Sequence, residues 1–93
     1  MPLGFYFTPQ SFSTEQYDET IRRLQAAGAG SPQGRSYHCA FSNRGGGGLH
    51  VFDVWDSQES FEKFGETLMP IMTELGVDPG APQVAEIHNI IIG

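Results

Sequence analysis

Residues 49–61 read LHVFDVWDSQESF and place a strand-like segment directly against the start of a helix. Aromatic and β-branched residues dominate 49–55, as is typical of a β-strand. Asp56 or Ser57 then offers a helix-capping side chain, and Glu59 stands at the capping-box position relative to Asp56. The residues that follow at helical spacing form one apolar stripe: Phe61, Phe64, Leu68, Ile71 or Met72, and Leu75. The segment therefore predicts a strand that enters a helix without an intervening loop.

This second helix contains Pro70 inside its apolar pattern. A proline removes one amide donor, and its ring clashes with the preceding helical turn. The sequence therefore predicts that the helix kinks or splits near Leu68.

The N-terminal third of the chain predicts a strand followed by a helix. Residues 3–8 (LGFYFT) are β-prone, and Ser13 with Gln16 forms a capping box in which Phe12 can pack on Tyr17. One apolar stripe then recurs at helical spacing: Tyr17, Ile21, Leu24, and Ala27 or Gly28.

Two further β-prone segments, residues 35–44 and 49–56, flank the glycine run Gly45–Gly48 and predict an antiparallel hairpin in which Arg44 pairs with Leu49. A final strand is predicted over residues 84–92 (VAEIHNIII). The order βαββαβ and right-handed crossovers give an α+β, ferredoxin-like fold. Its four-stranded antiparallel sheet has the order 4-1-3-2, with both helices on one face, and residues 1–93 are expected to form one domain.

The composition excludes several classes of partner. Eleven acids against five bases give a net charge of −6, which argues against a nucleic-acid backbone or an anionic membrane surface. RNA-recognition modules of this topology need a basic aromatic motif on the third strand, whereas residues 49–56 carry two acids and no Lys or Arg. No apolar run reaches the ~20 residues of a membrane span. The lone Cys39 fits a cytoplasmic protein.

The predicted register sorts the hairpin side chains onto two faces. One face is almost wholly apolar, and we expect the helices to cover it: Cys39, Phe41, Phe52 and Val54. The other face mixes apolar and titratable groups: His38, Ala40, Leu49, Val51, Asp53 and Trp55. If Phe5, Phe7, Ile87 and Ile91 point toward the helices, the outer strands extend this mixed face: Tyr6, Thr8, Glu86, His88 and Ile90. So large an uncovered patch predicts a homodimer that forms through the open sheet face.

With this order of elements, the chain resembles the dimeric α/β-barrel superfamily, in particular its antibiotic-biosynthesis-monooxygenase-like (ABM) domains and their small uncharacterised members. The resemblance covers nearly the whole chain and rests on the βαββαβ order, the junction VWDSQESF at residues 54–61, and EIHN at residues 86–89. It implies two sheets packed face to face as a barrel, with any small-molecule pocket between the sheet and the helices of each subunit.

The resemblance implies diverse activities: cofactor-free oxygenases, haem-degrading oxygenases, isomerases, and proteins without a known reaction. The haem-degrading type has an Asn on the first strand, and a Trp and a His on the second helix. The matching places here hold Phe5 to Phe7, Phe64 and about Glu74. The resemblance therefore argues against haem degradation, and we expect no cofactor.

Three residues are the candidates for catalysis: His38, Asp53 and His88. Asp53 is expected diagonally across the hairpin from His38, within reach of its side chain. A carboxylate beside an imidazole fixes its tautomer and raises its basicity, as a general base requires. His38 or His88 is therefore the candidate base, with Asp53 as the orienting carboxylate.

Four further residues are candidates for binding a small hydrophobic or aromatic ligand: Tyr6, Trp55, Glu86 and Asn89. Asn89 follows His88, so it points to the opposite face and can line the pocket between sheet and helices. His50 stands beside the glycine tip and is expected to be solvent-exposed. No spacing of His and Cys matches a zinc site, and no metal is expected.

Two functions remain open from the sequence. The first is a cofactor-independent monooxygenase or isomerase that acts on a small aromatic or enolic compound. The second is a non-catalytic homodimer that binds a small ligand or a partner, in which His38 and His88 belong to a hydrogen-bond network that fixes pairing. The sequence does not decide whether the protein is an enzyme.

Overall fold

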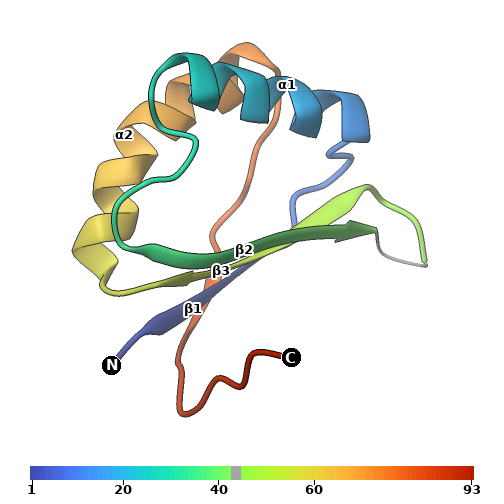
Figure 1. Cartoon of the computed structure of the whole chain (residues 1–93). Coiled ribbons are helices and arrows are strands. Elements are labelled where there is room, and N and C mark those ends of the chain that lie inside the picture. Colours follow the sequence, from blue (N-terminus) through green and yellow to red (C-terminus); the bar gives the residue numbers. More distant parts are fainter. Residues whose placement is uncertain (43–44) are drawn as a thin grey trace.

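The computed structural model describes residues 1–42 and 45–93, and its elements follow the predicted βαββαβ order. They are β1 (Leu3–Phe7), α1 (Thr14–Ala26), β2 (Arg35–Ser42), β3 (Leu49–Trp55), α2 (Gln58–Glu74) and β4 (Gln83–Glu86). The antiparallel sheet has the order β2-β3-β1-β4, which is the predicted order read from the other edge. Both helices cover the same face of the sheet (Figure 1), so the ferredoxin-like α+β fold is confirmed. Neither helix of the described chain combines the length and the apolar character that crossing a membrane requires.

Helix α1 begins as the capping box predicted. The backbone amide of Gln16 donates to Ser13 Oγ at 3.0 Å, and the backbone amide of Ser13 donates to Oε1 of the Gln16 side chain at 2.9 Å. The rings of Phe12 and Tyr17 pack edge to face at 5.9 Å, which closes the hydrophobic staple. At the other end, Gly28 adopts φ 75°, the left-handed conformation that ends a helix readily.

Ser13→Ala is expected to lower the free energy of unfolding by about 1 kcal/mol, because the Gln16 amide loses its acceptor. Urea denaturation followed by circular dichroism measures the loss. Thr14→Ala, one residue further along at an exposed position, is the matched control and should change little. Equal effects of the two substitutions would contradict a specific capping role.

Helix α2 begins at one of its two predicted caps. This is Ser57, whose Oγ accepts from the Ser60 backbone amide at 3.1 Å, so the alternative cap Asp56, with Glu59 at its capping-box position, is wrong. The helix continues through Pro70, so of the two predicted effects of this proline, a kink or a split, the split is wrong. Apolar side chains on both sides of the proline, Leu68 and Met72, pack into the core. This tertiary packing holds the helix together across the lost hydrogen bond.

The faces of the hairpin are opposite to the expectation. Leu49 pairs with Ser42, whereas its predicted partner Arg44 lies outside the described residues. A shift of two residues leaves the sorting into faces unchanged. The helices, however, cover the mixed group, and Trp55 is fully buried against α2. The apolar group with Cys39 and Phe52 lies on the open face.

The pairing of β1 with β3 explains this inversion. Phe5 stands opposite Asp53, and residues paired across a strand share a face. Because Phe5 is fully buried under the helices, as predicted, Asp53 must face the helices as well.

Strand β4 ends at Glu86, so the predicted strand over residues 84–92 is wrong beyond that point. Its partner strand β1 begins at Leu3, opposite Glu86. The Ile87 amide still donates to the Pro2 carbonyl at 2.9 Å, but a proline has no amide to donate in return. The chain beyond Ile87 therefore leaves the sheet, and Ile91 and Ile92 are 80% and 83% exposed.

Candidate functional site

The centre of the site is a pair formed by His38 on β2 and Asp53 on β3. The two residues stand directly opposite each other, and His38 Nδ1 lies 2.5 Å from Asp53 Oδ1. Asp53 is 5% exposed, and its second oxygen accepts from Trp55 Nε1 at 3.4 Å. The buried carboxylate accepts a hydrogen bond from the Nδ1–H group of the imidazole. This fixes the tautomer in which Nε2 carries the lone pair. The predicted contact between these two residues is therefore present.

Tyr17 on α1 completes a chain of three groups. Its hydroxyl lies 2.7 Å from His38 Nε2, and the two rings are nearly coplanar, with an angle of 3° between them. Since Nδ1 carries the proton toward Asp53, the tyrosine hydroxyl is the donor to Nε2. Burial raises the pKa of Tyr17; the positive charge of Arg35 opposes this effect, and the negative charge of Asp53 adds to it.

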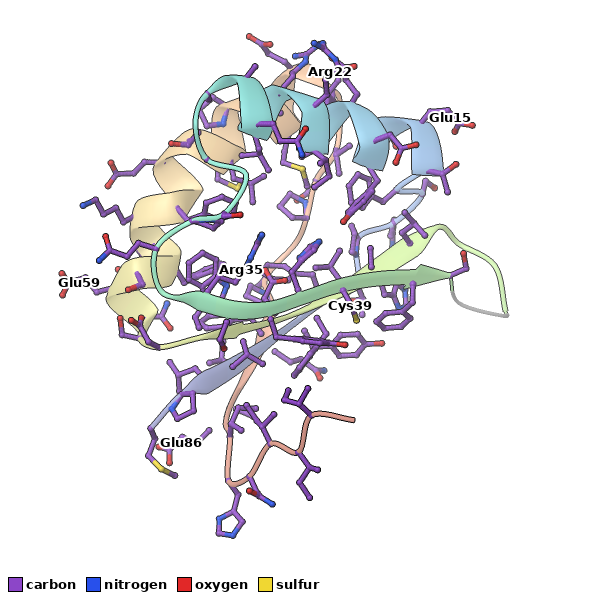
Figure 2. The ribbon with its side chains drawn as sticks, in the orientation of Figure 1. Glu15, Arg22, Arg35, Cys39, Glu59 and Glu86 are labelled. Carbon is purple, nitrogen blue, oxygen red and sulfur yellow. The ribbon has the colours of Figure 1, made fainter. Side chains whose placement is uncertain are left out.

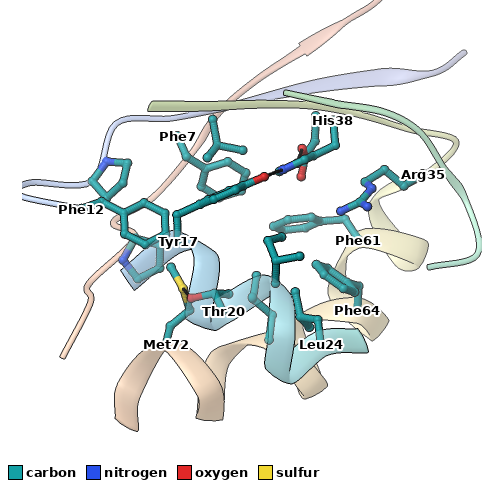
Figure 3. A pocket seen from close by; sticks show the side chains of 16 residues that line it. Phe7, Phe12, Tyr17, Thr20, Leu24, Arg35, His38, Phe61, Phe64 and Met72 are labelled. Atoms are coloured by element: carbon teal, nitrogen blue, oxygen red, sulfur yellow. Dashed lines mark hydrogen bonds and ion pairs between the residues drawn. The ribbon is translucent and has the colours of Figure 1, made fainter. Parts of the chain in front are cut away.

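The three groups stand at the wall of a cavity of about 70 Å³ between the sheet and the helices (Figure 3). Most of its lining is aromatic or aliphatic: Phe7, Pro9, Phe12, Ile21, Leu24, Val51, Phe61, Phe64, Leu68, Met72 and Pro79. Its polar lining comes from Tyr17, Thr20, Arg35, His38 and Asp53. A dry cavity of about 150 Å³ admits benzene, so a ring compound enters this one only if lining side chains turn aside.

None of the four predicted ligand residues is among the described residues that line this pocket. Trp55 packs on two lining residues, Phe61 and Phe64, and its Nε1 atom donates to Asp53. Tyr6 lies on the open face, where its hydroxyl is 3.2 Å from His50 Nδ1. His50 is half-buried there, so its predicted exposure is wrong.

The C-terminal candidates lie outside the pocket. Glu86, His88 and Asn89 are exposed, and Glu86 lies at the end of the edge strand β4 (Figure 2). His88 and Asn89 follow the end of β4, so the face assignment that joined them to His38 and to the pocket is wrong.

Sequence reasoning missed Tyr17 and Arg35 as site residues. Tyr17 lies on the apolar stripe of α1, and a tyrosine at that spacing usually packs in a core. The signal that singles it out is structural, since only the fold brings α1 over His38. Arg35 starts β2 at one end of the pocket.

Two other features bear on what the molecule can hold. A groove of about 500 Å³ lies between the α1–β2 connection and the first turns of α2, and no predicted site residue lines it. Within residues 1–42 and 45–93, no three His, Cys, Asp or Glu side chains gather as metal ligands would.

Tyr17→Phe is expected to make the protein less sensitive to alkali. An unfolded tyrosine loses its proton near pH 10, whereas burial raises the pKa of Tyr17 above that value. The folded state therefore holds the proton longer, and this contribution to stability is complete below about pH 10 and is lost as the pH rises further. Urea midpoints between about pH 9 and pH 11 should fall more steeply for the wild type than for the variant. Parallel slopes would contradict a raised pKa at Tyr17.

Comparisons with known proteins give a fold and no sequence family. No family model matches the chain, and no curated protein matches it. A candidate antibiotic biosynthesis monooxygenase from Chloroflexus aurantiacus J-10-fl is similar in structure, with a TM-score of 0.66, 16% identity, and coverage of 100% of both chains. A variant of SnoaB, a cofactor-independent oxygenase from Streptomyces nogalater, has a TM-score of 0.67 and 14% identity, with coverage of 97% of this chain and 96% of that chain. A candidate antibiotic biosynthesis monooxygenase from Deinococcus radiodurans has a TM-score of 0.58 and 14% identity, with coverage of 99% of this chain and 97% of that chain. The protein therefore has the fold of the antibiotic biosynthesis monooxygenase domains.

Proposed function

We propose that the protein binds a small aromatic or enolic compound between its sheet and helices and removes a proton from it with His38. The observation that carries this proposal is the Tyr17–His38–Asp53 chain, which ends at an apolar pocket. Asp53 holds the imidazole with Nε2 as the acceptor. The Tyr17 hydroxyl marks the position, 2.7 Å from Nε2, that an acidic hydroxyl of a substrate would take.

Proton removal prepares such a compound for reaction with dioxygen. The phenolate or enolate is electron-rich and passes one electron to dioxygen, and the two radicals combine to form a carbon–oxygen bond. The resulting peroxide loses water to leave a carbonyl, so one oxygen atom enters the product and the other enters water. A C–H carbon of the phenol or enol becomes C=O, and its hydrogen and the hydroxyl proton leave in the water molecule, which balances the reaction without a further reductant. SnoaB, a cofactor-independent oxygenase, has a similar fold, and this similarity supports oxygenation over isomerisation.

A non-catalytic binding module is the second candidate, and two observations favour it. The cavity of about 70 Å³ is small for a ring compound, and the Tyr17 hydroxyl already occupies Nε2 of His38. In that case the three groups serve to hold α1 against the sheet.

The open sheet face supports a homodimer as part of the same proposal. It carries Tyr37, 47% exposed, and Phe41, 40% exposed, next to Tyr6 and Phe52. Aromatic side chains gathered on one face are typical of a surface that a partner covers. Native mass spectrometry of the freshly purified protein tests this point: a dimer is expected, and a monomer at micromolar concentration would contradict it. The expected cytoplasmic location stays a prediction.

Dioxygen uptake tests the catalytic proposal directly. Purified protein is mixed with naphthols or cyclic 1,3-diketones in air-saturated buffer that contains a metal chelator, and uptake is compared with protein-free controls. Uptake above the control supports an oxygenase, provided that a parallel reaction under ¹⁸O₂ places one ¹⁸O atom in each product molecule. Exchange of substrate hydrogen in D₂O without uptake supports an isomerase. Binding with neither reaction supports the non-catalytic module.

A further inference from the structure

Arg35 lacks the acidic partner that the other described arginines have. Arg22 and Arg23 both pair with Glu19, and Arg23 also reaches Glu74 at 2.8 Å. In the part of the chain that the structure describes, no carboxylate forms an ion pair with Arg35. This is notable in a chain with eleven acids and a net charge of −6.

The contacts that Arg35 does make hold it weakly. Its Nη2 atom donates to the Gly30 carbonyl at 3.4 Å, a long hydrogen bond. Its guanidinium carbon lies 5.7 Å from the centre of the Phe64 ring. Most of the five donor positions of the guanidinium therefore stay available to a ligand, and the side chain can turn when one enters.

Asp53, the acid among the described residues of the pocket lining, forms no ion pair with Arg35 and is engaged by other groups. Its Oδ1 atom is held by His38 Nδ1, and its Oδ2 atom accepts from Trp55 Nε1. Arg35, a half-buried residue, thus places a permanent positive charge at the wall of an apolar pocket, where a ligand anion could pair with it.

The surroundings of Arg35 indicate the shape of that ligand. Figure 3 shows the guanidinium pointing toward the end of the pocket where Tyr17 meets His38, with Phe61 and Phe64 beside it. Its charge acts on Tyr17 strongly enough to oppose the effect of burial on the pKa of that hydroxyl. A planar ring that lies against the two phenylalanines would therefore place an acidic substituent at Arg35 and a neighbouring hydroxyl at His38.

We propose that the substrate of this pocket is an aromatic or enolic carboxylate, and that Arg35 is the residue that selects it. A guanidinium offers two parallel donors that match the two oxygens of a carboxylate, whereas a phenolate or enolate offers one oxygen. This inference rests on the proposed function for the place of binding, and it adds the chemical class of the substrate.

Calorimetric titration with matched ligands tests the inference. The probes are 1-hydroxy-2-naphthoate and its methyl ester, which share the ring and the hydroxyl but differ in charge. The wild type is expected to bind the carboxylate about 10-fold or more tightly than the ester. Arg35→Gln should remove this difference, and Arg35→Lys should retain part of it, because lysine keeps the charge without the paired donors. Arg22→Gln is the matched control, since Arg22 is exposed and is not among the lining residues of the pocket, and it should leave the difference intact.

The outcomes separate this inference from the proposed function. Equal binding of acid and ester by the wild type, or equal weakening of both by Arg35→Gln, would overturn the carboxylate class alone. Dioxygen uptake with neutral naphthols would then still support the proposed function. Failure of both ligands to bind the wild type, together with no uptake, would overturn both. Circular dichroism of each variant confirms that its fold is intact before binding is compared.

Discussion

Replacement of Trp55 by alanine is expected to destabilise the protein by about 3–5 kcal/mol. Trp55 and Phe5 are the two large side chains that are fully buried. The indole packs against Phe64 at 5.3 Å and Phe61 at 5.8 Å between ring centres. Its removal leaves a cavity under α2 and takes the Nε1 donor from Asp53. Small domains have a total stability of about 5–15 kcal/mol, so the variant is expected to lie close to unfolding.

Urea denaturation followed by circular dichroism is the appropriate measurement, because Trp55 is the single tryptophan and its fluorescence disappears with it. Ile92→Ala is the control: that side chain is 83% exposed, and its loss should change stability by less than about 0.5 kcal/mol. If Trp55→Ala does not fold, Trp55→Phe keeps most of the packing and should give an intermediate loss. A loss below about 1 kcal/mol for the alanine variant would contradict a core position.

The local elements could be predicted because their signals are carried by neighbours in the sequence. The capping box of Ser13 with Gln16 needs only one helical turn, and the junction at residues 54–61 joins a strand to a cap directly. The order of elements and the chirality rule for crossovers then leave few arrangements of the sheet. The fold of the chain follows from these local signals.

The faces of the sheet could not be predicted because both faces of the hairpin carry large apolar side chains. Phe52 and Val54 alternate with Val51 and Trp55 along β3, so periodicity alone gives no preference. The choice depends on the pairing of Phe5 with Asp53 between β1 and β3, which are far apart in the sequence.

The site was predictable only in its hairpin half. His38 and Asp53 lie on adjacent strands, so a short-range register brought them together even with an error of two residues. Tyr17 comes from a helix that reaches them only through the tertiary fold. His88 was joined to them by extending β4 past Glu86, where Pro2 ends the exchange of hydrogen bonds with β1.

Replacement of His38 by alanine is expected to lower the turnover number for dioxygen uptake about 10²–10⁴-fold, the range that a general base contributes. His38 lines the pocket, and no other histidine of the described residues does so. His50→Ala is the matched control, because His50 contacts Tyr6 on the opposite face of the sheet and should retain wild-type turnover.

Two readouts distinguish a catalytic base from a structural histidine. His38→Ala is expected to melt below His50→Ala, because it removes the partner of the buried Asp53 as well as the Tyr17 contact, whereas His50→Ala removes the Tyr6 contact; turnover is therefore compared at a temperature where circular dichroism shows both variants folded. Added imidazole should restore part of the activity of His38→Ala, because the ring it supplies can occupy the vacated space beside Asp53. Full turnover in His38→Ala would assign proton removal to another group. Loss of turnover in His50→Ala alone would move the reaction to the open face, where Tyr6, Phe41 and His50 pack together, and would make the aromatic patch a substrate surface in place of a dimer contact.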